Sequence, residues 1–159
     1  MPLRLVLVNP KIPPNTGNIA RTCAATGTPL HLVGPLGFEI SDRQLKRAGL
    51  DYWPHVDLTY HADWNTFDTH QTQVGGRRIG FSVRGTENYH QFAFQAQDWL
   101  LMGSETDGLS AASLATCDHV VRIPMNQAHV RSLNLSVSAA IGLFEARRQL
   151  GLLTDTPSP

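Results

Sequence analysis

The sequence predicts one α/β domain with a mostly parallel sheet and helices on both faces. Three observations support this prediction. Short apolar runs of strand length recur along the chain, helix-compatible segments separate several of them, and serine or glycine residues mark many of the boundaries. Strands that alternate with helices form parallel sheets covered on both sides. A chain of 159 residues is long enough to bury a core of its own.

The predicted elements follow one another along this chain in an alternating order. The expected strands are Leu3–Val8, Leu30–Val33, Val56–Thr59, Arg78–Val83, Trp99–Met102 and Val120–Ile123. The expected helices are Thr16–Thr26, Asp42–Ala48, Ala62–Asp68, Ala111–Ala115 and Leu135–Leu150. Ser41 and Ser110 suit helix N-caps, whereas three glycines suit helix ends, at Gly27, Gly49 and Gly151. We expect one domain over residues 1–153 and a disordered tail over residues 154–159.

The composition indicates a cytoplasmic protein. No run approaches the roughly 18 apolar residues that a membrane span needs, and no signal peptide precedes the first expected strand. Cys23 and Cys117 are the only cysteines and form no Cys-x-x-Cys pair. We therefore expect a reduced protein with two buried thiols.

Polar residues gather in three segments where expected strands end. The first, Asn15–Thr26, contains two asparagines, a glycine and Arg21, which supply amide groups, close backbone approach and a planar cation. The second is Leu100–Leu109, and the third joins Ile123-Pro-Met125 to Val130–Ser138. Ligands collect at such positions in α/β proteins. For the first segment alone, a helix cap beside a surface arginine explains the residues equally well.

Taken together and in this order, the three segments resemble the motifs of the SPOUT-class RNA 2′-O-ribose methyltransferases. The resemblance is greatest to the TrmL/YibK family of tRNA wobble-position methyltransferases, which the segment Lys46–Trp53 also resembles. It covers roughly Leu3 to Leu150. It implies a SPOUT fold with a C-terminal trefoil knot, in which the segment after Ile123 passes through an earlier loop. The hydrophobic pattern alone predicts an open flavodoxin-like sheet instead.

The resemblance implies S-adenosylmethionine as cofactor and nucleotide 34 of tRNA, a cytidine or a modified uridine, as target. The residues that match cofactor-binding positions are Phe81, Gly103, Ile123, Met125, Ser132 and Leu133. We expect Gly103 to let the backbone approach the cofactor, while Phe81 and Ile123 also fit an ordinary sheet core. One departure is Ser82-Val-Arg84-Gly85, where many relatives have a threonine-lysine-glycine run.

The resemblance also implies a set of catalytic residues. Arg21 matches the arginine that activates the ribose hydroxyl. Because a guanidinium stays protonated and is a poor base, we expect it to grip a phosphate and polarise the hydroxyl. The other matches are Asn15, Glu105, Ser132 and Asn134. Asn15 either orients Arg21 or the substrate or caps a helix, and Glu105 either pairs with Arg21, caps the following helix or is a plain loop carboxylate. Ser132 and Asn134 are expected near cofactor and ribose.

Several residues near these motifs have weaker assignments. Arg131 is a candidate phosphate contact and His129 a secondary candidate base. Tyr52 and Trp53 either stack on an exposed base or pack in the core. The remaining histidines show no metal-ligand spacing, and methyl transfer from a sulfonium needs no metal, so we predict no metal site.

The charge distribution bears on the expected partner, tRNA. A net charge of zero argues mildly against RNA binding. However, residues 1–55 contain six of the basic residues and three acidic ones, which allows a local basic patch. The helix expected at Leu135–Leu150 is apolar around most of its circumference, which predicts a homodimer through it. The alternatives are methylation of another tRNA or rRNA nucleotide, a non-catalytic RNA-binding protein and a nucleotide-binding module.

Overall fold

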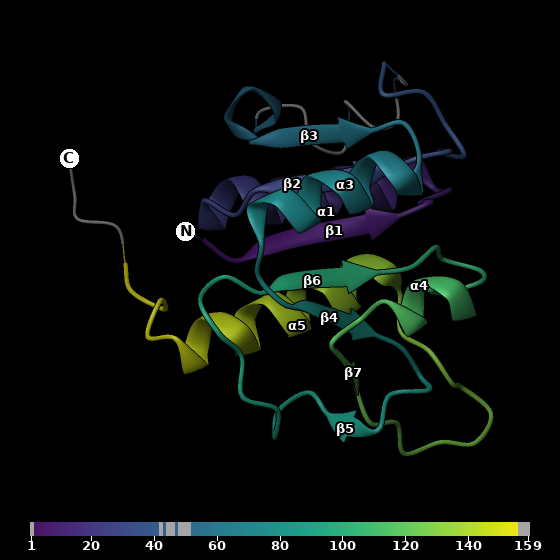
Figure 1. The fold of residues 1–159 in the computed structure, drawn as a ribbon, viewed down its shortest axis with the longest axis vertical. Helices are drawn as coiled ribbons and strands as arrows, with labels where there is room; N and C mark the ends of the chain where they lie inside the picture. Colours follow the sequence, from purple (N-terminus) through teal and green to yellow (C-terminus); the bar gives the residue numbers. More distant parts are fainter. Residues whose placement is uncertain (1, 42, 44–46, 48–51, 156–159) are drawn as a thin grey trace.

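The computed structural model of the protein describes residues 2–41, 43, 47 and 52–155. Within these residues, seven parallel strands form one sheet in the order β3-β2-β1-β6-β4-β7-β5, from the top to the bottom of Figure 1. The strands are β1 (Arg4–Val8), β2 (Leu30–Val33), β3 (Leu58–His61), β4 (Arg78–Phe81), β5 (Glu87–Asn88), β6 (Trp99–Met102) and β7 (His119–Arg122). The predicted α/β class is therefore confirmed.

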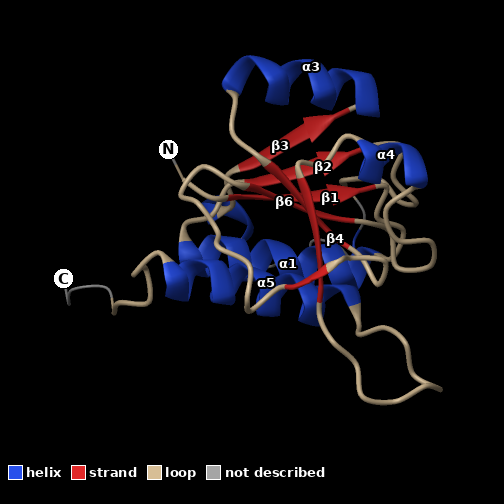
Figure 2. Ribbon diagram, turned by 60° about the horizontal axis from the view of Figure 1, so that its bottom comes forward, coloured by secondary structure: helices blue, strands red, loops and turns tan. Residues whose placement is uncertain are grey.

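Helices cover both faces of this sheet (Figure 2). They are α1 (Pro13–Thr26), α3 (Trp64–Val74), α4 (Ala111–Ala115) and α5 (Leu135–Gln149), together with the 3₁₀ turn η1 (Trp53–His55). α1 and α5 contact each other on one face, and α3 and α4 lie on the other. Because all strands are parallel, their carboxyl ends meet at one edge, where the loops of an α/β fold form binding sites.

Most predicted elements are found, and the differences have local causes. Strand β3 lies two residues later than expected. Helix α3 begins at Trp64 because Asp63 caps it, accepting a hydrogen bond from the Thr66 amide at 2.8 Å, and it continues to Val74. Strand β5 was not predicted, because its two polar residues carry no strand pattern. Ser110 caps α4 as expected. The predicted helix 42–48 and Gly49 fall largely or wholly outside the described residues.

The two faces of the sheet have separate apolar cores. Leu5, Leu7, Leu30 and Leu32 pack toward α1 and α5, and their neighbours in the strands pack toward α3. Cys23 is buried in the first core, while Cys117 is only partly buried beside the second; burial raises the pKa of both thiols, to about 12 and about 11. Among the described residues, no helix is long and apolar enough to cross a membrane. The trefoil knot stays a prediction.

Helix α5 lies close to the sheet because small residues line its inner side. Ala139, Gly142 and Ala146 are buried together with Leu143. The outer side carries Val137 and Phe144, which are 46% and 44% exposed, and Ile141, which is half-buried. The apolar pattern around the helix therefore has two parts, a buried stripe toward the sheet and an uncovered stripe away from it.

Replacement of Leu143, which has no exposed surface, tests this packing. We expect Leu143→Ala to lower the free energy of unfolding by about 2–5 kcal/mol, because the side chain leaves a cavity between α5 and the sheet. Urea denaturation followed by circular dichroism measures the change. Arg148→Ala, which truncates an exposed side chain on the same helix, is the control and should have a far smaller effect.

Candidate functional site

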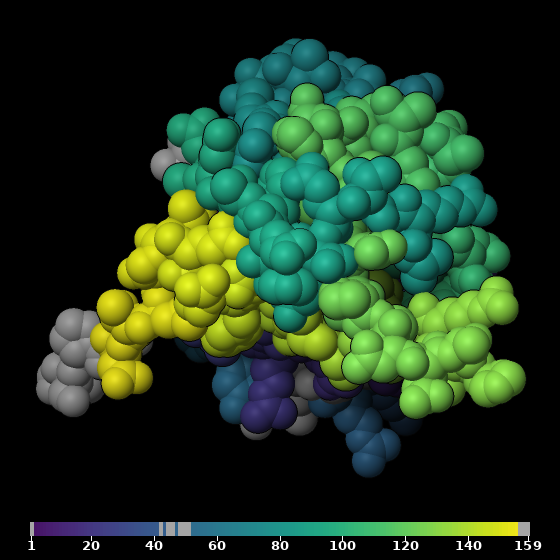
Figure 3. Space-filling view, turned by 90° about the horizontal axis from the view of Figure 1, so that it is seen from below, coloured from purple at the N-terminus to yellow at the C-terminus, as the bar shows by residue number. Residues whose placement is uncertain are grey.

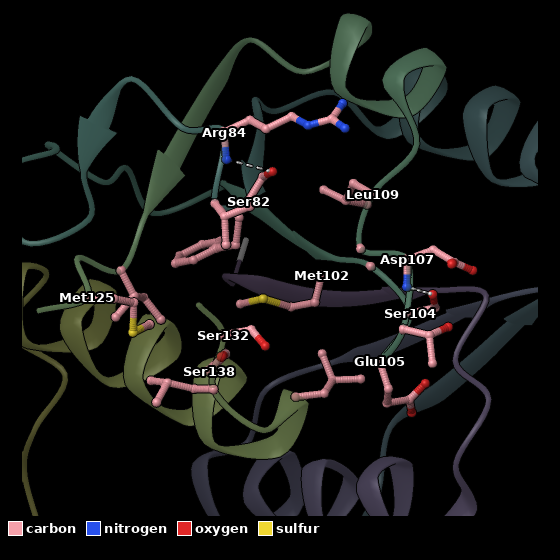
Figure 4. A pocket seen from close by; sticks show the side chains of 18 residues that line it. Ser82, Arg84, Met102, Ser104, Glu105, Asp107, Leu109, Met125, Ser132 and Ser138 are labelled. Carbon is pink, nitrogen blue, oxygen red and sulfur yellow. Dashed lines mark hydrogen bonds between the residues drawn. The ribbon is translucent and has the colours of Figure 1, made fainter. Parts of the chain in front are cut away.

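A pocket of about 290 Å³ lies at the carboxyl edge of the sheet (Figure 4). Its walls come from the segment after β4, the loop after β6, and the segment between β7 and the first turns of α5. This volume is just below the usual range for ligand pockets, about 300–1,000 Å³. Residues 123–134, light green in Figure 3, stand out from the body of the molecule and form one side of the pocket.

The structure places every predicted cofactor-binding residue in the lining of this one pocket. They are Phe81, Gly103, Ile123, Met125, Ser132 and Leu133. In Figure 4 the Met102 side chain lies between Met125 on one side and Asp107 on the other, with Ser132 below it. The remaining wall has several residues that the sequence did not single out for this role: Ser82, Val83, Arg84, Met102, Ser104, Thr106, Asp107, Gly108, Leu109, Leu135 and Ser138. Five of them adjoin a predicted site residue in the chain, namely Ser82, Met102, Ser104, Thr106 and Leu135.

Gly103 has a second role beside the expected approach to the cofactor, which stays a prediction. A Cβ atom at this position would lie 2.0 Å from the carbonyl carbon of Gly108 and 2.1 Å from the Leu109 nitrogen. The glycine therefore lets the following turn fold back against strand β6. The turn is closed by the Gly108 amide, which donates to the Ser104 carbonyl at 3.0 Å, and by Ser104 Oγ, which accepts from the Asp107 amide at 3.1 Å. The close contact with this turn is therefore the reason that position 103 requires a glycine.

Glu105 connects the pocket to the start of helix α1. Its carboxylate accepts hydrogen bonds from the backbone amides of Lys11 at 2.8 Å and Ile12 at 3.1 Å. Lys11 Nζ in turn binds Thr106 Oγ1 at 3.1 Å and Asp107 at 2.7 Å, which lowers the pKa of that carboxyl. Helix α1 has prolines in its first turn and no capping side chain of its own, so the negative charge of Glu105 lies where the helix dipole favours it.

This arrangement corrects the predicted role of Glu105. The carboxylate makes no ion pair with Arg21. Its hydrogen bonds support the start of α1, some 90 residues earlier in the chain, and not the following helix, α4.

Asn15 and Asn134 bring the first and third motifs together. Asn134 Nδ2 donates to Asn15 Oδ1 at 3.1 Å, and Asn134 Oδ1 caps α5 by accepting from the amides of Ser136 and Val137. Asn15 is buried in the first turn of α1, whose N-cap is Ile12, so the interpretation of Asn15 as a helix cap is wrong. Asn134 is a helix cap, but it caps α5 and not α1. Neither asparagine lines the pocket.

Arg21 is exposed on α1 and outside the pocket lining. Its guanidinium lies over the ring of Tyr52, 4.6 Å from the centroid, and donates to the Tyr52 hydroxyl at 3.3 Å. Tyr52 is 37% exposed, while Trp53 packs against the core. The rest of the predicted segment, residues 46 and 48–51, is outside the described part of the chain. Tyr52 thus orients the predicted catalytic arginine, and no local sequence pattern predicted this contact.

The two weaker candidates lie on the projecting segment. His129 and Arg131 are both exposed, and Arg131 Nε donates to the Ala128 carbonyl at 3.3 Å.

Three histidines converge between α3 and the face of the sheet that it covers, away from α1 and α5. They are His31, His61 and His70, which showed no metal-ligand spacing in the sequence. No sequence pattern indicated this cluster, because its members come from three different elements.

The model of the SpoU rRNA methylase family matches residues 2–144. The chain belongs to this family. The predicted family resemblance is thereby confirmed. A Synechocystis protein, provisionally assigned as a tRNA (cytidine(34)-2′-O)-methyltransferase, is 64% identical over 93% of this chain and 97% of its own length. The tRNA (cytidine(34)-2′-O)-methyltransferase of Burkholderia cenocepacia is 46% identical over 92% of this chain and 95% of its own.

Solved structures of SpoU-family relatives share the fold. A structure that concerns the 2′-OH methylation of C/U34 on tRNA has a TM-score of 0.89 and 48% identity, covering 94% of this chain and 96% of that one. The AdoMet-bound rRNA methyltransferase of Sinorhizobium meliloti has a TM-score of 0.86 and 28% identity, covering 94% of this chain and 57% of its own.

Gly142 gives a direct test of the pocket. A Cβ atom there would lie 2.7 Å from Cε2 and Cζ of Phe81, so Gly142→Ala should push that ring into the pocket. We expect S-adenosylmethionine to bind about 10-fold or more weakly, since overpacking of this kind costs about 1–3 kcal/mol. Isothermal titration calorimetry measures the affinity, and a circular dichroism melt checks that the variant is folded. Undiminished binding would remove Phe81 from the cofactor site.

Proposed function

We propose that the chain is an S-adenosylmethionine-dependent tRNA 2′-O-ribose methyltransferase that acts on nucleotide 34, a cytidine or a modified uridine. The observation that carries the proposal is the match over nearly the whole chain to relatives with this activity in their names. The substrate and the free cysteines together favour a reducing, cytoplasmic location.

The pocket suits this cofactor. Its lining combines apolar side chains with hydroxyl groups and carboxylates, which fits a ligand with an apolar-faced ring, a ribose and positive charge. The close turn at Gly103 adds backbone groups to one wall. The bound cofactor supplies an activated methyl group on its sulfonium. The protein's own contribution is to hold the ribose hydroxyl in line with that group, and alignment of this kind can supply about 7–11 kcal/mol.

Arg21 is the residue that we assign to the RNA. A guanidinium stays charged and offers a planar fork of donors, so it binds a phosphate and polarises the neighbouring 2′-hydroxyl rather than removing its proton. The ring of Tyr52 holds this cation on the surface of α1. Asn15 and Glu105 act by fixing the first turn of the same helix. Ser132, in the pocket wall, is the hydroxyl that we place nearest to both cofactor and ribose.

We further infer that two copies assemble through α5. The stripe formed by Val137, Ile141 and Phe144 has the spacing of one helix face and is apolar, yet Val137 and Phe144 are exposed and Ile141 is only half-buried. Exposed apolar patches of this kind mark interaction surfaces. A dimer also doubles the basic surface available to RNA in a chain with no net charge.

Two alternative functions differ in what they require. Methylation of another tRNA or rRNA nucleotide uses the same site, whereas a non-catalytic RNA-binding protein has no need for the pocket or for the arginine held on Tyr52. Transfer of radiolabelled methyl groups to unmodified bulk tRNA, followed by nucleoside mapping, distinguishes them. Label on the ribose of nucleotide 34 is expected. Label elsewhere, or none, would contradict the proposal.

Replacement of Arg21 tests its role within this reaction. We expect Arg21→Ala to lower kcat for tRNA methylation at least about 100-fold, as loss of a transition-state donor does, while cofactor affinity stays unchanged. Arg21→Lys should also be poor, because an ammonium cannot reproduce the planar fork. His129→Ala is the matched comparison. If His129→Ala were inactive and Arg21→Ala near normal, the activating group would be the histidine.

Replacement of Phe144 tests the dimer. We expect Phe144→Glu to produce monomers with little tRNA methylation, because it places a charge in the apolar stripe. Analytical ultracentrifugation at micromolar concentration measures the oligomeric state. Tyr60→Ser, at an exposed aromatic residue of strand β3, is the control and should remain dimeric. A monomeric and fully active wild type would show that the stripe has another purpose.

A further inference from the structure

Three imidazole rings meet on the face of the sheet that α3 covers. His31 comes from β2, His61 from β3 and His70 from α3. One potential ligand atom from each residue lies within 4.8 Å of the others. His31 Nδ1 and His61 Nε2 are 3.0 Å apart. None of the three lines the pocket, and α1 and α5 lie on the opposite side of the sheet, so this cluster is separate from the methyl-transfer site.

The rings lie in a largely apolar setting. His31 and His61 are 5% and 3% exposed, and the cluster contacts Phe67 and Trp99. Burial, followed by the charges of His61, His70 and Arg4, lowers the pKa of His31 to about 3. Burial likewise lowers the pKa of His61. Neutral imidazoles are the form that binds zinc and related ions, since each then has a nitrogen lone pair free.

We propose that His31, His61 and His70 form a three-imidazole site for a divalent ion of the zinc class, which joins α3 to strands β2 and β3. Three histidine ligands leave a fourth position for water or hydroxide. Positive charge from Arg4 near His31 opposes a divalent cation there, and an anion such as hydroxide at the fourth position would offset it.

The spacing of the nitrogens in the cluster is close to that of such a site. Nitrogens at about 2.0–2.1 Å from a tetrahedral ion lie about 3.3–3.4 Å from one another, near the separation of the His31 and His61 nitrogens. These two nitrogens face each other in a hydrogen bond, so both rings must turn to bind one ion, while the paired strands fix the positions of their backbones. His70 is half-buried, so it supplies the third ligand from the solvent side and leaves the ion a path of entry.

The site has a structural purpose. In the described sheet β3 is the edge strand, with β2 as its neighbour, and α3 packs over it. An ion bound by one ligand from each of these three elements would fasten the edge of the sheet, since metal-binding free energy adds to folding free energy. Without an ion, His31 and His61 share a hydrogen bond and the His70 ring only packs against them.

The test is metal binding by the full chain after dialysis against a chelator. Calorimetric titration with Zn²⁺ should give one ion per chain, and the melting temperature should rise by about 5–10 °C at a free concentration about 100-fold above the Kd. His70→Ala removes a half-buried ligand from the helix surface and should weaken binding by more than about 100-fold. His90→Ala, at an exposed histidine outside the cluster, is the control and should bind like the wild type.

Two outcomes would overturn the proposal. One is a wild-type chain that takes up no ion at this stoichiometry, and the other is a His70→Ala variant that binds as tightly as the wild type. If that variant does not fold, the visible spectrum of the Co²⁺-loaded wild type decides. A tetrahedral nitrogen-ligated spectrum is expected. A thiolate charge-transfer band would assign the ion to Cys23 or Cys117 and contradict the site.

Discussion

The contact between the side-chain amides of Asn15 and Asn134 holds the candidate site together. It joins residues 119 positions apart, and the same Asn134 side chain caps α5, so the start of that helix and the first turn of α1 have a fixed relation. The pocket segment from Ile123 onward ends at this cap, and its last residues therefore depend on it. Glu105 provides the second connection, from the loop after β6 to the amides before α1. The three polar segments thus support one another.

The sequence was most informative where local pattern decides the outcome. Buried parallel strands need continuous apolar residues, and the runs at Leu30–Val33 and Trp99–Met102 were predicted with their observed bounds. All six residues predicted to bind the cofactor line the pocket, because the ordered motifs contain them, but eleven other lining residues were not singled out. Strand β5 was missed, since its pairing with β7 comes from tertiary packing and not from the residues Glu87 and Asn88 themselves.

The roles of single residues were less predictable than their places. Glu105, Asn15 and Gly103 each interact with a partner that the local sequence does not reveal: amides some 90 residues earlier, a second asparagine, and a turn that folds back. The histidine cluster has the same origin. His31, His61 and His70 show no ligand spacing along the chain, and only the pairing of β2 with β3 beneath α3 brings them together. Convergence of distant residues is a property of the fold.

The position of Arg21 gives the proposed dimer a further role. Arg21, which we assign to the ribose hydroxyl, does not line the pocket of its own chain. Within one subunit the arginine and the cofactor pocket are therefore separate. Helix α1 contacts α5, and the uncovered stripe of α5 begins at Val137, within the turn that follows the pocket wall. A second copy seated on this stripe would bring its α1 toward the first copy's pocket. Shared sites of this kind require both subunits, so in the proposed dimer a small chain with no net charge would depend on assembly to bind RNA.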